Sequence, residues 1–126
     1  MAECARVLRP AGRLVFPDIL HRGTLSARDM QCLFEGMAFS EIATAEQYTE
    51  LLRARGLEVV RVMDLTQQWT RILVDRHAMH RSLQSQTAGR LGREHSERYD
   101  REYEYFVGLY RSGVLAGALV HARKAG

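Results

Sequence analysis

The stretch ECARVLRPAGRLVF (residues 3–16) sets the fold of this 126-residue chain. Its first part carries apolar side chains at the i, i+3, i+4 and i+7 spacing of one helix face: Met1, Cys4, Ala5 and Leu8. Pro10 ends that helix, and Ala11-Gly12 turns the chain. Residues 14–16 are then a short continuous apolar run, as expected of a strand buried on both faces. The stretch therefore predicts a helix, a turn and a buried strand, in that order.

Helical and strand patterns alternate through the rest of the chain. Two residue pairs have the capping-box spacing of helix starts: Ser26 with Asp29, and Thr44 with Gln47. Apolar side chains recur at helical spacing in four segments: 30–37, 48–52, 69–83 and 99–110. Residues 57–65 and 118–123 have the composition of strands. This alternation predicts a single α/β domain over residues 1–126.

Composition and charge are those of an ordinary globular chain, with 46% hydrophobic and 26% charged residues. The net charge of +3 does not form a nucleic-acid stripe, because residues 90–104 mix both signs at the i,i+4 spacing of surface ion pairs. No apolar run reaches the roughly 20 residues that span a bilayer. The two cysteines, Cys4 and Cys32, do not suggest a disulfide framework. We therefore expect a cytoplasmic protein that binds neither nucleic acid nor membrane.

Four passages carry a resemblance to a known family. Residues 3–16 resemble the helix, Pro-Gly-Gly turn and strand that lie late in the sheet of class I, Rossmann-like methyltransferases. Residues 48–60 are similar to the next helix and strand, and residues 119–124 match the closing strand. Asp64-Leu65-Thr66 followed by Trp69 is similar to sugar and amine methyltransferases of the group that includes the ubiquinone-biosynthesis enzymes. The passages keep the family's order and cover nearly the whole chain.

The resemblance implies the C-terminal portion of a Rossmann-like methyltransferase sheet. About three strands are expected, two of them parallel and the last antiparallel between them, with helices on both faces. The family binds its methyl donor, S-adenosylmethionine, through a glycine-rich turn and an acidic residue after the second strand. No such turn occurs in this sequence. We therefore expect an incomplete methyltransferase fold without the donor-binding half, with no cofactor-binding residues of its own and no affinity for S-adenosylmethionine alone.

The strand of residues 14–16 has a partner on each side in the family, and one of those partners belongs to the missing half. Its open apolar edge is expected to pair with a second copy of the chain, giving a dimer, or with a donor-binding partner chain. Pro17 would mark where this pairing ends, because proline has no backbone N–H to donate.

In this family the loops that follow the strands build the pocket for the small-molecule acceptor. The resemblance places Asp18, Ile19 and His21 in one such loop, and Asp64 and Thr66 in another. His21 is the candidate catalytic base, because an imidazole titrates near neutral pH; an exposed loop histidine is the alternative. Asp18 and Asp64 either orient an acceptor hydroxyl or amine or cap the helices that follow them.

Helices that carry Phe34 and Trp69 would form a lid over this pocket, although a tryptophan at the position of Trp69 is more often part of a core than of a pocket wall. His77 and His80 are three residues apart on a helix, but no further ligand has metal-site spacing, so no metal is expected. A tyrosine stripe indicates a core or interface surface, with a stacking platform as the alternative: Tyr99, Tyr103 and Tyr110.

Three functional hypotheses follow from these residues and from the resemblance. The chain is the substrate-side portion of a small-molecule methyltransferase, a non-catalytic module that binds a small molecule or a partner, or a degenerate fragment. Methyl transfer by the chain alone is not expected, because the donor site is absent.

Overall fold

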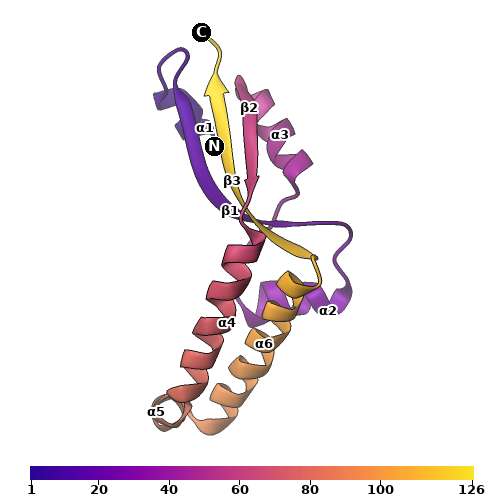
Figure 1. Cartoon of the computed structure of the whole chain (residues 1–126), viewed down its shortest axis with the longest axis vertical. Helices are drawn as coiled ribbons and strands as arrows, with labels where there is room; N and C mark the ends of the chain where they lie inside the picture. Colours follow the sequence, from indigo (N-terminus) through magenta and orange to yellow (C-terminus); the bar gives the residue numbers. More distant parts are fainter.

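The computed structural model describes the backbone of residues 1–126 and every side chain except that of Thr87. Three strands and seven helical segments alternate along the chain (Figure 1): α1 (Ala2–Val7), β1 (Arg13–His21), α2 (Ala27–Met30), the π-helical η1 (Gln31–Gly36), α3 (Ala45–Ala54), β2 (Leu57–Asp64), α4 (Thr66–Ser82), α5 (Gln84–Leu91), α6 (Arg93–Arg111) and β3 (Leu115–Lys124). The α/β class and the order of elements expected from the sequence are confirmed.

The strand β1 is longer than the apolar run predicts. It continues through Pro17 as far as His21, so the residues expected in a loop belong to the strand itself. Proline is tolerated there because β1 is an edge strand, and its missing N–H lies on the unpaired side. Ala11 in the preceding turn has a φ of 62°, a left-handed conformation that glycine adopts more readily.

The sheet has the order β1-β3-β2, and both pairings are antiparallel. The closing strand β3 lies between the other two, as expected. The two strands expected to be parallel do not pair with each other, so the sheet contains no parallel ladder among the described residues; β1 and β2 share a direction only because each is antiparallel to β3. A bulge between Val59 and Arg61 shifts the β2 register by one residue.

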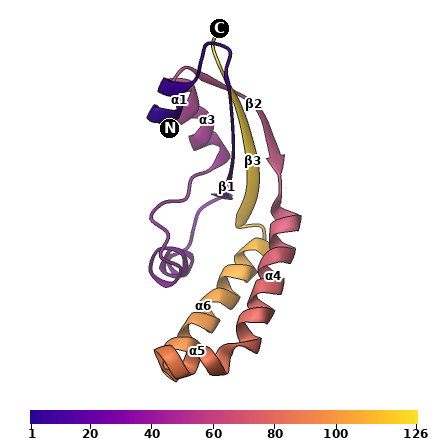
Figure 2. The ribbon, with the colours of Figure 1, turned by 90° about the vertical axis from the view of Figure 1, so that its left-hand side faces the viewer.

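Helices α1 and α3 both lie on the same side of the sheet (Figure 2), contrary to the expectation of helices on both faces. Between them and the sheet lies a small apolar core of Ala5, Leu52, Leu57, Val120 and Ala122. The opposite side, which we call the bare face, carries the alternate side chains of the same strands. Helix α4 reaches the bare face only at one end. There the Trp69 indole packs on Gly117 so closely that it occupies the space a Cβ on that residue would need.

Helices α4 and α6 run side by side away from the sheet, with α5 at the far end (Figures 1 and 2). We call these three helices the arm. A second core joins the arm to η1 and to the end of the sheet: Cys32, Leu33, Phe106, Leu109, Tyr110 and Leu115. Gly92, with a φ of 91°, separates α5 from α6, which begins six residues earlier than the apolar stripe predicts. Both predicted capping boxes are present.

Candidate functional site

The carboxyl ends of β1 and β2 lie at the same edge of the sheet, next to the arm (Figure 1). His21 is the last residue of β1 and Asp64 the last of β2. An ion pair of 3.5 Å between Arg22 and Asp64 links the two ends. Both side chains are more than half exposed, so this pair contributes little to stability. The sheet therefore brings together two predicted site residues that are 43 positions apart.

Local hydrogen bonding fixes the tautomer of His21. Its Nδ1 lies 2.9 Å from the carbonyl oxygen of Gly23. A carbonyl oxygen only accepts, so Nδ1 carries the proton and Nε2 of the neutral ring keeps a free lone pair. The ring lines a cavity of about 420 Å³ that also contains Thr44, Glu46 and Asp64. A base-competent nitrogen is therefore available at this edge.

The carboxylate of Asp64 holds the start of α4. It accepts hydrogen bonds from the backbone N–H of Thr66, at 2.9 Å, and from the Thr66 hydroxyl. These bonds, the hydroxyl first, hold the pKa of Asp64 below its usual range. Leu65 is the N-cap residue of α4, so Asp64 contacts the first turn of this helix without occupying the cap position itself.

Asp18 turns toward α3. Its carboxylate accepts a short hydrogen bond from the Tyr48 hydroxyl and a second, of 2.8 Å, from the N–H of Ile19. Burial, together with this hydrogen bond, raises the pKa of Tyr48 well above its ordinary value. Asp18 does not line the His21 cavity. It fastens α3 to β1 and caps no following helix.

A second cavity, of about 410 Å³, lies between β1, the segment after η1, and the arm. We call it the apolar groove, and its walls include Ile19, Phe39, Trp69, Ile72, Arg76 and Tyr103. Two predicted site residues, Ile19 and Trp69, line it. Phe34 packs against the neighbouring core and lines neither cavity. The sequence did not single out Phe39 and Arg76, because a periodic pattern does not distinguish a residue in a groove wall from one in the core.

The histidine pair and the tyrosine stripe are packing features of the arm. His77 is buried, stacks on Tyr103 and lies 2.8 Å from Asp100. His80 contacts the rings of Tyr99 and Tyr103. Among the described residues there is no group of three or more His, Cys, Asp or Glu side chains suited to a metal ion. The same part of the chain has no helix long and apolar enough to cross a bilayer.

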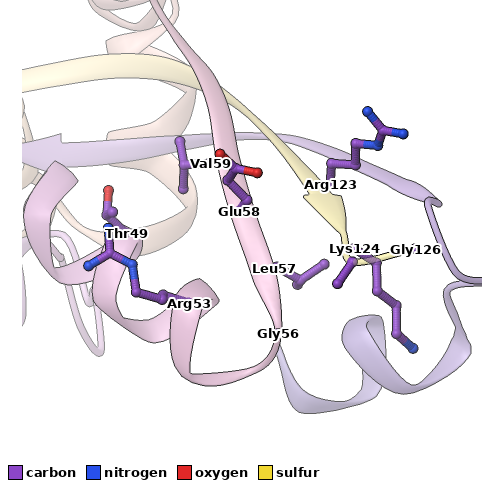
Figure 3. A pocket seen from close by; sticks show the side chains of 10 residues that line it. Thr49, Arg53, Gly56, Leu57, Glu58, Val59, Arg123, Lys124 and Gly126 are labelled. Atoms are coloured by element: carbon purple, nitrogen blue, oxygen red, sulfur yellow. The ribbon is translucent and has the colours of Figure 1, made fainter.

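A third cavity, of about 630 Å³, lies at the opposite end of the sheet (Figure 3). Arg53, Glu58, Arg123 and Lys124 are among its lining residues. The ammonium of Lys124 donates to the carbonyl oxygens of Ala5 and Leu8, at 2.7 and 2.9 Å. Lys124 thereby satisfies the end of α1, and this cavity is remote from His21 and from the apolar groove.

Comparison with known proteins assigns the fold. No model of a known protein family matches the chain. The cyclopropane synthase MmaA2 of Mycobacterium tuberculosis superposes with a TM-score of 0.85 and 19% identity, over 98% of this chain and 48% of that one. A protein of Galdieria sulphuraria described as a sarcosine dimethylglycine methyltransferase gives 0.81 and 21%, over 98% and 46%. This chain has the fold of the C-terminal portion of a class I methyltransferase.

Sequence similarity points in the same direction. The methyltransferase GfsG of Streptomyces halstedii is 39% identical over an alignment of 75 residues, and the match covers 54% of this chain and 26% of that protein. The chain thus spans about half the length of the two solved structures above, and its match covers about a quarter of this relative. Among the solved structures, CmaA1 was crystallised with S-adenosylhomocysteine, and a Haemonchus contortus phosphoethanolamine methyltransferase with S-adenosylmethionine.

Proposed function

We propose that this chain forms the acceptor side of an S-adenosylmethionine-dependent methyltransferase acting on a small molecule, and that it works with a donor-binding half. The observation that carries the proposal is a fold that matches about half the length of two solved methyltransferases, while the outer side of β1 has no strand partner and much of one sheet face is uncovered by the described residues. Two further structural features support it.

The first feature is the outer edge of β1. Hydrogen bonds to β3 flank the strand at Gly12 and Arg22, so even-numbered residues face β3 and odd-numbered ones face outward. At the outer edge the N–H of His21 donates to Ala43 and that of Ile19 to the Asp18 side chain. Pro17 has no N–H. The free outward donors are therefore those of Arg13, just before the edge of residues 14–16 that is expected to pair with a partner, and Val15, in the middle of it.

The second feature is the bare face. Val15 and Val60 are each 54% exposed, and Met63 is 36% exposed. The Nε2 of His121, which lies on the same face, is buried without a hydrogen-bond partner among the described residues. The exposed apolar side chains on this face fit a surface that another layer of protein covers. A donor-binding half that pairs with β1 would reach this face.

His21 supplies the chemistry in this proposal. Methyl transfer breaks a carbon–sulfur bond and forms a bond between the methyl carbon and the acceptor oxygen or nitrogen. The acceptor then loses a proton, and the free lone pair on Nε2 of His21 can take it. This half would also speed the reaction by holding the acceptor in a fixed position beside the His21 ring.

A second candidate is a module that binds a small molecule or a partner without catalysing methyl transfer. The [4+2]-cyclase SpnF has the same fold, with a TM-score of 0.71 and 22% identity over 98% of this chain. A shared fold therefore hosts different reactions.

Calorimetry with S-adenosylmethionine tests the dependence on a donor half. The chain alone is expected to show no saturable binding up to about 1 mM, which corresponds to less than about 4 kcal/mol of binding free energy. A hybrid in which this chain replaces the matching portion of the Streptomyces halstedii methyltransferase is expected to bind the donor and to release S-adenosylhomocysteine with that enzyme's acceptor.

Two outcomes contradict the proposal. Stoichiometric, micromolar binding by the isolated chain would show that no donor half is needed. A hybrid that binds the donor but transfers no methyl group would show that this chain does not serve the acceptor. His21→Gln in an active hybrid provides the matched variant, because glutamine keeps a donor for Gly23 but cannot take a proton.

A further inference from the structure

The apolar groove contains one wall residue of a different chemical kind. Its cavity of about 410 Å³ falls within the range of small-molecule sites, and nearly all of its wall is aliphatic or aromatic. Arg76 of α4 is the charged residue in that wall. An arginine on an apolar cavity places its methylene stem along the wall and its guanidinium at the rim.

Arg76 has no ion pair or hydrogen bond within the described part of the chain. The residues one turn away on α4 offer no acid: Ile72, Leu73, Met79 and His80. One turn further along, Arg81 is held by Asp100 at 3.0 Å and by Glu104 at 3.6 Å. Burial raises the pKa of Tyr103, and the nearby charge of Arg76 partly offsets this rise. The guanidinium is therefore close to the groove wall and free to receive an anion.

The groove reaches the sheet close to the carboxyl end of β1. Ile19 contributes to its wall from β1, two residues before the end of that strand at His21. On the arm side, Ile72 is 46% exposed. A ligand lying in the groove would cover this side chain and would extend from Arg76 toward the sheet.

We propose that the apolar groove binds a small molecule with an apolar body and an anionic group, the body against Trp69 and Phe39 and the anion on Arg76. This inference rests on the proposed function and names the acceptor class: an apolar carboxylate, or another apolar anion, that carries the nucleophile at its other end. Charge-assisted bonds from a guanidinium to a carboxylate are the strong, orienting contacts that such a site needs.

Trp69 makes the proposal directly measurable, because it is the single tryptophan of the chain and lies in the groove wall. Decanoate, decanol and decyltrimethylammonium, each below its aggregation limit, are titrated against the full chain while Trp69 emission is recorded. Decanoate is expected to bind about tenfold or more tightly than decanol, because only it offers the charged acceptor that Arg76 lacks. The cation is expected to bind weakest.

Two variants separate the groove from the rest of the surface. Arg76→Gln is expected to abolish the preference for decanoate over decanol while leaving decanol binding unchanged. Arg71→Gln, on the same helix but outside the groove wall, is expected to change neither. Circular dichroism checks that each variant is folded.

Equal binding of decanoate and decanol by the native chain would overturn the proposal, and so would an equal loss of decanoate affinity in both variants. Emission that no probe changes would also overturn it, and would indicate that the groove receives protein from a donor half. These measurements need no methyl transfer, so a failed groove and a failed acceptor-side function are distinguished.

Discussion

The sheet and the arm differ in the interactions that hold their elements together. In the arm, His77, Arg81 and Asp100 join α4 to α6 through bonds of 2.8 to 3.2 Å, and aromatic rings stack beside them. The sheet has its own core on the face of α1 and α3, and each of its outer strands, β1 and β2, has one side without a strand partner. Both regions nevertheless expose apolar side chains, Met79 and Leu91 in the arm and Val15 and Val60 on the sheet. The arm also contains buried polar atoms of His80 and Ser96 that have no hydrogen-bond partner among the described residues. The two regions therefore differ in how their elements are joined: polar side chains link the helices of the arm, whereas backbone ladders and an apolar core hold the sheet together.

The largest expected effect is in the one-sided sheet core. Leu52→Ala removes a side chain with 0% exposure between α3 and the sheet. The variant is expected to lose about 2 to 5 kcal/mol of unfolding free energy. The substitution leaves a cavity between α3 and the sheet, and side chains on the bare face lie on the other side of the sheet and cannot fill it. Denaturant unfolding followed by circular dichroism measures the loss. Leu51→Ala, whose side chain is 40% exposed on the same helix, is the control. Equal losses in both variants would mean that this core is not the main support of the sheet.

The next effect concerns the polar link within the arm. Arg81, and then His77, holds the pKa of Asp100 below its usual range against the opposing effect of burial. The stabilisation is therefore complete above the ordinary pKa of aspartate, about 3.9, and is lost as the pH falls through the lowered native value. Asp100→Asn is expected to cost about 1 to 2 kcal/mol at neutral pH. Its difference from the native chain should vanish in strong acid.

Unfolding curves at neutral and acidic pH test this link. Glu97→Gln removes the partner of Arg93 in an exposed i,i+4 pair and is expected to cost no more than about 0.5 kcal/mol at either pH. A difference between Asp100→Asn and the native chain that persists unchanged in acid would show that packing, and not charge, joins the two helices.

The smallest effect on stability is expected at the open edge. Val15 is exposed, so Val15→Lys should change the unfolding free energy by no more than about 0.5 kcal/mol. The same charge opposes edge-to-edge pairing. Light scattering at micromolar concentration is expected to show association of the native chain and a monomer for this variant. Val7→Lys, on an exposed position of α1, should associate as the native chain does. A native chain that is already monomeric would leave β1 available for a donor-binding partner alone.

Much of the local structure was predictable from short-range patterns. The capping boxes at Ser26 and Thr44 form as expected, because a cap involves residues only three positions apart. The extent of β1 was not predictable from its apolar run. Pro17 and Asp18 look like a strand end, yet an edge position tolerates the missing N–H, and Tyr48 satisfies the Asp18 carboxylate.

The candidate site divides in the same way. The sequence identified His21, Asp64, Ile19 and Trp69 as site residues, and the fold distributes them between two cavities. The sequence did not identify Arg76. This residue matters because no carboxylate in the described part of the chain forms an ion pair with it. A periodic pattern reports which face of a helix is apolar, but it does not report which of those faces is left open.

By itself, the sequence determined the order of helices and strands, their caps and the resemblance to a methyltransferase, because these depend on residues close together in the chain. The tertiary structure alone decided that both sheet-covering helices lie on one side, that His21 and Asp64 lie at the same end of the sheet, and that Arg76 faces an apolar groove without a partner. Each of these depends on contacts between segments distant in sequence, where packing and hydrogen bonding select one arrangement among many that local patterns allow.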